Sequence, residues 1–195
     1  MRNLLILSTA LTFSATANAE LITFDESAAT NGAGFGLTNE YQSLGVSFTA
    51  GFAHTYDGIS DGDPGGFGID GDGSVQFLGI RSAQPTVRIQ FDSSVEQVSL
   101  RAIQGGIPFP TDSLNIVAWN GLQQVDAHFI GFNFGSSWIT VNLSGTIDAI
   151  TISGTGTTGA AAFGIDNLQW TAVPAPGACT AFGLVGLATL RRRRA

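Results

Sequence analysis

Val87-Arg88-Ile89-Gln90-Phe91 alternates apolar side chains with the polar Arg88 and Gln90. Successive side chains of a β-strand point to opposite faces, so a period of two predicts a strand with one face on a core and the other in solvent. One-sided burial of this kind is typical of antiparallel sheets. The segment therefore predicts an antiparallel strand and excludes an amphipathic helix here.

The same alternation recurs along most of the chain, and glycine-rich turn signals separate the segments. Many short strands at this spacing predict an all-β fold, an antiparallel β-sandwich of the jelly-roll or lectin-like kind. The apolar members of the other segments are Leu44, Val46 and Phe48; Val98, Leu100 and Ala102; Leu114, Ile116 and Ala118; and Ile139, Val141 and Leu143.

Two local features carry sharper predictions. Asn120-Gly121 suits a type I′ turn, with one strand ending at Trp119 and the next beginning at Leu122. In the last segment, Phe163 and Ile165 share a face with Leu168 and Trp170 only if one extra residue intervenes. We therefore expect a β-bulge at Asp166-Asn167, which would re-aim one of these polar side chains.

The charge distribution limits the classes of function. Residues 20–173 hold three arginines, no lysine and all fifteen carboxylates, a formal charge of −12. Such a body repels nucleic-acid phosphates and favours divalent cations. The absence of lysine excludes Schiff-base catalysis and a P-loop lysine. No histidine or serine catalytic motif is present either, so we expect a non-catalytic protein.

The N-terminal residues 1–19 resemble a secretory signal peptide. Arg2 gives a positive start, Leu4 to Phe13 are mostly apolar, and Ala17-Asn18-Ala19 is a small-residue cleavage site. The mature chain is expected to begin at Glu20. With Cys179 as the single cysteine, a disulfide within the domain at residues 20–172 is excluded, so that domain must be held by its own core.

The loop from Asp57 to Gly73 carries five aspartates, among them Asp61 and Asp63, between seven glycines. Calcium takes six to eight oxygen ligands, and clustered carboxylates on a flexible backbone suit it. The spacing does not match an EF-hand. Either the loop binds calcium, or it is a solvated glycine–aspartate loop that binds nothing in particular.

Asp25 and Asp166 form a second, non-local candidate. The first and last strands of jelly-roll modules commonly pair, which would bring the segment ending at Asp25 beside the segment ending at Asp166. A calcium ion held between the two carboxylates would then join the two ends of the domain. The alternative is a pair of exposed carboxylates at strand ends.

Aromatic side chains leave two possibilities open. They either pack in the core and at sheet edges or provide a platform on which sugar rings stack. A secreted polysaccharide hydrolase is the catalytic alternative, and it would need two carboxylates about 5–10 Å apart in one cleft. The aromatic candidates are Phe52, Tyr56, Trp119, Phe129, Phe132, Phe134 and Trp138.

The C-terminal residues 173–195 have three parts. Val173-Pro174-Ala175-Pro176 precedes the apolar run Gly177–Leu190, and Arg191-Arg192-Arg193-Arg194 follows it. Fourteen apolar residues are fewer than the ~20 of a comfortable membrane-spanning helix, and the arginines favour the cytoplasmic side. The run therefore suits a transient anchor or a helix on the membrane surface.

This tail resembles the PEP-CTERM sorting signal of bacterial proteins processed by exosortases, with Ala175 in place of the usual glutamate. The segments Thr38–Phe48 and Phe163–Leu168 also resemble stretches of the lectin-like ectodomains attached to such tails. The resemblance implies a processing protease of the exosortase type, transient contact with the inner membrane, and delivery to the surface or extracellular matrix of a Gram-negative bacterium. Cys179 leaves lipidation as an alternative.

Overall fold

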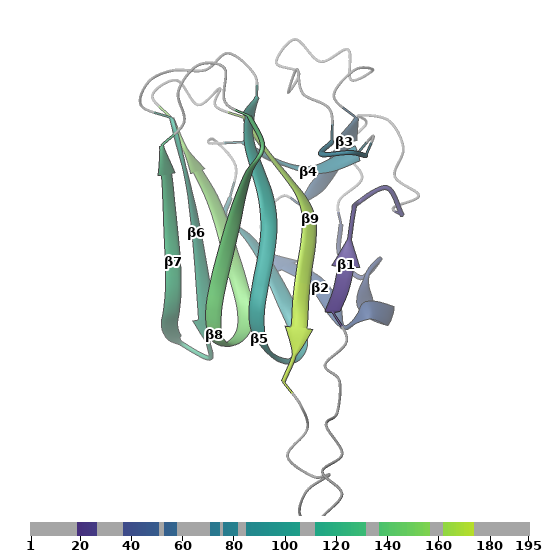
Figure 1. Ribbon diagram of the computed structural model, residues 1–195, viewed down its shortest axis with the longest axis vertical. Coiled ribbons are helices and arrows are strands. Elements are labelled where there is room, and N and C mark those ends of the chain that lie inside the picture. The colour runs from purple at the N-terminus through teal and green to yellow at the C-terminus, as the bar shows by residue number, and fades with distance from the viewer. Residues whose placement is uncertain are drawn as a thin grey trace, which may run out of the picture. The chain divides into compact units, whose positions relative to one another are not determined.

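The computed structural model describes the central part of the chain, and a compact unit that runs from Asn18 to Val173 contains every described residue (Figure 1). The predicted signal peptide, apart from its last residue, and the sorting tail beyond its first residue lie outside the described part. Within that part, no helix is long and apolar enough to span a bilayer. The described ranges are 19–26, 37–50, 53–57, 71–74, 76–81, 85–105, 112–131, 137–156 and 162–173.

Nine strands of the described residues form one antiparallel sheet, which confirms the prediction of an all-β antiparallel fold. Its main path runs β3-β4-β9-β5-β8-β6-β7, while β1 pairs with β9 and β2 pairs with β5. The strands are β1 (Ala19–Ile22), β2 (Val46–Ala50), β3 (His54–Asp57), β4 (Gln76–Arg81), β5 (Val87–Gly105), β6 (Ser113–Asn120), β7 (Gln123–Gly131), β8 (Ile139–Thr155) and β9 (Ala162–Ala172), with a 3-10 turn at Gln42–Leu44.

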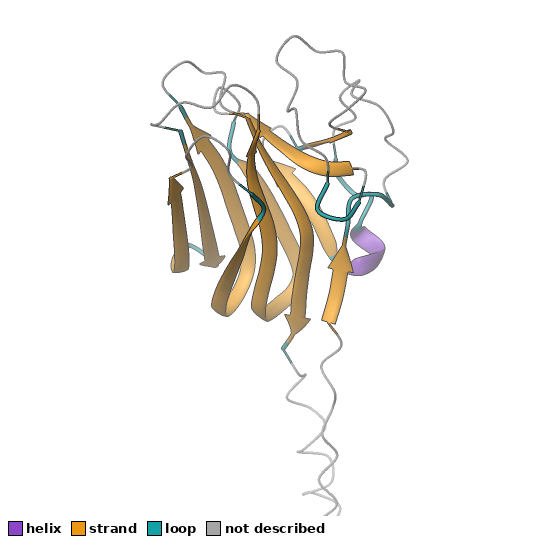
Figure 2. Ribbon diagram, turned by 45° about the horizontal axis from the view of Figure 1, so that its top comes forward, coloured by secondary structure: helices purple, strands orange, loops and turns teal. Residues whose placement is uncertain are grey.

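The two longest strands, β5 and β8, connect two parts of this sheet. The start of β5 pairs with β2 and its second half pairs with β9, while β8 lies along the other side of both halves. The register between β5 and β8 shifts between Gln90 and Gln97, and Gly145 in β8 has a φ of +116°. Figure 2 shows both ribbons curving back at this end of the sheet.

One apolar cluster fills the inner face of the bent sheet. It includes side chains from both halves of β5, and the rings of Phe91 and Trp170 lie 5.7 Å apart between centroids. The predicted period of two is confirmed in β5, β6 and β8, whose alternate apolar residues are buried except for Ile139, which is half-buried against the same core. Leu44 departs from it, because it belongs to the 3-10 turn before β2 and is exposed.

The β6–β7 hairpin corrects one detail of the turn prediction. Asn120 pairs with Gln123, so the two central residues are Gly121 and Leu122 rather than Asn120 and Gly121. Of these two, only Gly121 has a positive φ, +61°. A positive φ at the first central position alone is the pattern of a type II′ turn, in which glycine is favoured there. The type I′ assignment is therefore wrong by one position.

The ends of the domain meet as expected, because β1 pairs with β9 from Ala19 opposite Thr171 to Ile22 opposite Leu168. The predicted bulge is also present. Between Ser99 and Arg101 on β5, the partner strand β9 advances from Gln169 to Asp166, one residue more than β5 does. Within the bulge Asn167 has a φ of +48°, and the neighbouring Asp166 has no exposed surface.

Candidate functional site

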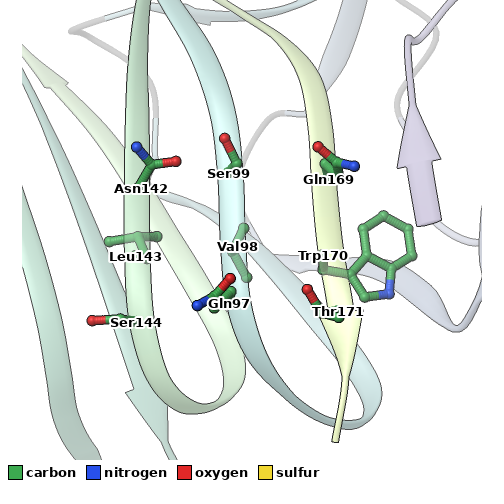
Figure 3. A pocket seen from close by; sticks show the side chains of 9 residues that line it. All are labelled: Gln97, Val98, Ser99, Asn142, Leu143, Ser144, Gln169, Trp170 and Thr171. Atoms are coloured by element: carbon green, nitrogen blue, oxygen red, sulfur yellow. The ribbon is translucent and has the colours of Figure 1, made fainter. Parts of the chain in front are cut away.

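A hollow of about 370 Å³ lies over three adjacent strands, β8, β5 and β9 (Figure 3). Three residues from each strand line it. They are Asn142, Leu143 and Ser144 on β8, Gln97, Val98 and Ser99 on β5, and Gln169, Trp170 and Thr171 on β9.

The strand register arranges the polar residues of the hollow in two rows. Ser99 lies opposite both Asn142 and Gln169, and one step along the sheet Gln97 lies opposite both Ser144 and Thr171. Neighbouring strands are ~4.8 Å apart, so each row presents three hydrogen-bonding side chains at that spacing. The intervening Val98, Leu143 and Trp170 are buried in the core, which fixes the strands beneath the rows.

All nine residues that line the hollow lack an ionisable side chain. Amides and hydroxyls both donate and accept hydrogen bonds, so the rows suit a neutral ligand that also has donors and acceptors. Sequence reasoning missed this site. Each polar residue was visible as the solvent side of an alternating segment, but the register that aligns three strands depends on pairings between residues far apart in the chain.

A buried carboxylate forms a second polar centre at the β9 bulge. Oδ2 of Asp166 accepts 2.8 Å hydrogen bonds from the backbone N–H of Asp72 and the hydroxyl of Ser74, and Oδ1 accepts one of 2.7 Å from the N–H of Asn167. These bonds attach the segment 71–74, the end of the aspartate-rich loop, to the last strand. The bulge therefore positions Asp166 to hold a loop in place.

Arg101 on β5 strengthens this attachment. Its Nε donates to Oδ2 of Asp72 at 2.6 Å, and its terminal nitrogens donate to the Thr140 hydroxyl and the Trp138 carbonyl oxygen. The side-chain amide of Asn167 donates to the Asp72 carbonyl oxygen at 2.9 Å. Arg101 thus connects the loop end with the start of β8, one row beyond the hollow.

At this centre the surroundings favour the protonated, neutral forms of the Asp166 carboxyl and the Tyr41 hydroxyl. Burial raises the pKa of Asp166 to about 6 despite its hydrogen bonds, and the negative charge of Asp25 adds to the rise. Burial also raises the pKa of Tyr41, helped by Glu26, Glu40, Asp25 and Asp166. The Tyr41 hydroxyl is buried and has no hydrogen-bond partner among the described residues. The negative charges of four carboxylates therefore act on a hydroxyl that has no hydrogen-bond partner among the described residues.

Of the four predicted metal ligands, only Asp25 and Asp166 lie among the described residues. The structure brings Asp25 and Asp166 to the same region, where Oδ1 of Asp25 accepts a 2.8 Å hydrogen bond from the N–H of Gln76. Asp61 and Asp63 lie outside the described residues. Across the described ranges, no group of three or more His, Cys, Asp or Glu side chains is placed to hold a metal ion. Calcium binding stays a prediction.

The aromatic candidates divide between the two expectations. Trp138 packs against Phe77 and Ala162, as core packing predicts. Phe129 on β7 is 73% exposed, and Trp119 on β6 is half-buried with Nε1 donating to Oγ1 of Thr151 at 2.8 Å. Phe52, Phe132 and Phe134 and the side chain of Tyr56 lie outside the described part.

No family model matches the chain, and no curated protein matches it either. Among solved structures, it is similar to the K2 cleaved adhesin domain of Lys-gingipain, at 12% identity and a TM-score of 0.45, covering 79% of this chain and 99% of that one.

The K3 cleaved adhesin domain from Porphyromonas gingivalis has 12% identity and a TM-score of 0.41, covering 62% and 91%. A mutant family 29 carbohydrate-binding module complexed with cellulohexaose has 12% identity and a TM-score of 0.41, covering 78% and 91%. At these identities and TM-scores the likeness does not indicate what this chain binds.

Proposed function

We propose that the chain is an exported, non-catalytic surface or extracellular-matrix protein whose β domain binds polysaccharide in the hollow. The observation that carries this proposal is the pair of rows of uncharged hydrogen-bonding side chains centred on Ser99 and Gln97. Sugar hydroxyls are donors and acceptors on a neutral framework, and the amides and hydroxyls of the rows complement them. Paired strands fix the backbone positions from which these groups extend, and this lowers the entropy cost of binding.

The composition of the hollow also bears on the catalytic alternative. A glycoside hydrolase needs a carboxylic acid and a carboxylate facing the scissile bond. The lining residues of the hollow supply neither. At the β9 bulge Asp166 has no exposed surface on which to meet a substrate. Polysaccharide hydrolysis therefore remains the less supported function, and release of reducing sugar by the purified chain would favour it.

A glycan array tests binding in the hollow. The full-length chain should bind neutral polysaccharides, and the double variant Gln97→Ala/Gln169→Ala should bind at least about tenfold more weakly, since it loses two or more hydrogen bonds. Gln42→Ala/Gln123→Ala is the matched control, because Gln42 in the 3-10 turn and Gln123 at the start of β7 are both exposed and lie outside the hollow. Equal losses in the two double variants, or no neutral glycan bound by the wild type, would contradict the proposal.

We further propose that the protein is exported with its signal peptide and processed at its PEP-CTERM-like tail. The bounds of the folded domain support this, because β9 ends one residue before Val173 and cleavage after Ala19 would remove only the first residue of β1. Mass spectrometry of the mature protein from its native host tests both ends. We expect an N-terminus at Glu20 and loss of Arg191–Arg194. An intact arginine cluster would refute processing by a sorting protease.

Calcium binding near Asp25 and Asp166 is a second proposed function, and the buried, unpaired Tyr41 hydroxyl favours it. The described oxygens are fewer than the six to eight that calcium takes, so the proposal includes Asp61 and Asp63 of the aspartate-rich loop. Calcium bound only by the folded state would raise the melting temperature. No difference between millimolar calcium and chelator would exclude it, as would an unchanged response in the Asp25→Asn variant.

A further inference from the structure

A second polar and aromatic surface lies on the other part of the sheet, where β6, β8 and the start of β5 run side by side. Ile116 and Ala118 of β6 belong to the core, so the intervening Val117 and Trp119 lie on the outer face. Two rows of paired residues cross β6, β8 and β5 there. The first row consists of Trp119, Ala149 and Gln90. The second row consists of Val117, Thr151 and Arg88.

The side chains of Trp119, Gln90 and Arg88 on this surface are each fixed by a hydrogen bond within the domain. The hydrogen bond from Nε1 of Trp119 to Thr151 ties the indole across to β8, toward the row that contains Arg88. Gln90 donates to the Asp148 carbonyl oxygen at 2.7 Å, and Arg88 donates to the Gln90 amide oxygen at 3.1 Å. A half-buried indole with fixed amide and guanidinium groups beside it provides a stacking surface and hydrogen-bond donors that need little further ordering.

Charge distinguishes this surface from the hollow. Arg88 contacts no carboxylate among the described residues, whereas Arg101 is paired with Asp72. No carboxylate lies in the two rows that contain Arg88 and Trp119. Arginine binds planar carboxylates with two parallel hydrogen bonds, so the natural ligand for a guanidinium that is not paired with a carboxylate is an anionic group.

We propose that this outer face binds a uronic-acid polysaccharide, with a sugar ring stacked on Trp119 and its carboxylate on Arg88. The inference rests on the proposed glycan-binding function but uses a different face and a different class of sugar. The acidic body repels a polyanion as a whole, so a preference for a uronate must come from local groups. Arg88 is the local group that supplies it.

The test compares two polymers that differ only at the carboxyl group, polygalacturonate and its methyl ester, with chelator present to exclude calcium bridging. The full-length chain should bind polygalacturonate about tenfold more tightly, the difference that one charge-assisted hydrogen bond gives. Arg88→Gln should abolish this preference, while the matched control Arg101→Gln should retain it. Trp119→Phe should weaken binding of both polymers, because it reduces the stacking surface.

The outcomes separate this proposal from binding in the hollow. Arg88→Gln should leave neutral polysaccharide binding unchanged, whereas Gln97→Ala/Gln169→Ala should leave the uronate preference unchanged. Melting temperatures of all variants establish that they are folded. Equal affinity of the wild type for the two polymers, or an undiminished uronate preference in Arg88→Gln, would overturn the proposal.

Discussion

The backbone N–H of Asp72 donates a 2.8 Å hydrogen bond to Oδ2 of Asp166, and this bond joins two residues 94 positions apart. The same carboxylate binds Ser74 and Asn167, while the carboxylate of Asp72 binds Arg101. The end of a glycine-rich loop is therefore fixed to the last strand through one buried side chain. Without these bonds, several partly buried polar groups would each lose a partner at once.

Asp166→Ala should destabilise the domain substantially. It leaves the backbone N–H groups of Asp72 and Asn167 without an acceptor in a partly buried place, and each such group costs about 1–3 kcal/mol, whereas the Ser74 hydroxyl keeps the Gln76 carbonyl oxygen. Because partial rehydration offsets some of the cost, we expect a loss of about 3 kcal/mol in the free energy of unfolding, measured by urea denaturation. Asp92→Ala is the control, since Asp92 is an exposed strand residue. Similar losses in both variants would contradict the structural role of Asp166.

Asp166 also makes stability depend on pH. Its pKa rises from 3.8 to about 6 on folding, so the native state holds this proton more tightly than the unfolded chain does. Between these two pKa values, the contribution of Asp166 to the free energy of unfolding must fall as the pH rises. The full cost of ionising the buried carboxyl is reached above about pH 6. A shift of this size corresponds to about 3 kcal/mol. Urea unfolding at several values between pH 4.5 and 7.5 measures it.

The variant Asp166→Asn isolates this contribution, because it removes the titrating group and keeps one acceptor oxygen. A carboxylate whose pKa is lowered on folding has the opposite effect, because it raises the stability of the domain as the pH rises. The pKa of Asp126 is lowered, chiefly by the backbone N–H of Ser144, so its ionised form favours the folded state as the pH rises. The decisive quantity is therefore the difference between wild type and variant. Parallel pH profiles for the two proteins would rule out a raised pKa for Asp166.

Much of the fold could be predicted from the sequence because it depends on local alternation. Val87, Ile89 and Phe91 indicate their strand and its buried face without reference to any partner. The bulge at Asp166-Asn167 was also predictable, because Phe163 and Trp170 must both reach the core. The bend of the sheet could not be predicted. The strand that pairs with β5 changes from β2 to β9 near Gln90, but the alternation of apolar residues in β5 is similar on either side of this point.

The candidate sites were harder to predict. The hollow exists because Asn142, Ser99 and Gln169 share one row, and only the pairing of three distant segments puts them there. The same applies to Trp119 and Arg88, which are 31 positions apart in the printed sequence but lie on neighbouring rows. Asp25 and Asp166 were predictable because pairing of the first and last strands is a general topological expectation, which β1 and β9 confirm.

The hairpin turn gives a prediction with a matched control in the adjacent residue. Gly121 has a φ of +61° and open space around the position of a side chain, so Gly121→Ala should cost about 1–2 kcal/mol through backbone strain alone. Leu122 is 99% exposed, so Leu122→Ala should change stability by less than about 0.5 kcal/mol. Chemical denaturation of both variants checks this. A larger loss for Leu122→Ala than for Gly121→Ala would contradict the turn geometry.

The pairing of the two chain ends can be tested on two neighbouring residues of β1. Ile22 is fully buried in the core, whereas Leu21 is 48% exposed on the other face of the same strand. Ile22→Ala should therefore lose about 2–5 kcal/mol of stability, because it removes buried methyl groups and leaves a cavity. Leu21→Ala should lose much less. Equal, small effects in the full-length chain would mean that β1 does not dock on β9, and the proposed calcium link between Asp25 and Asp166 would then lose its basis.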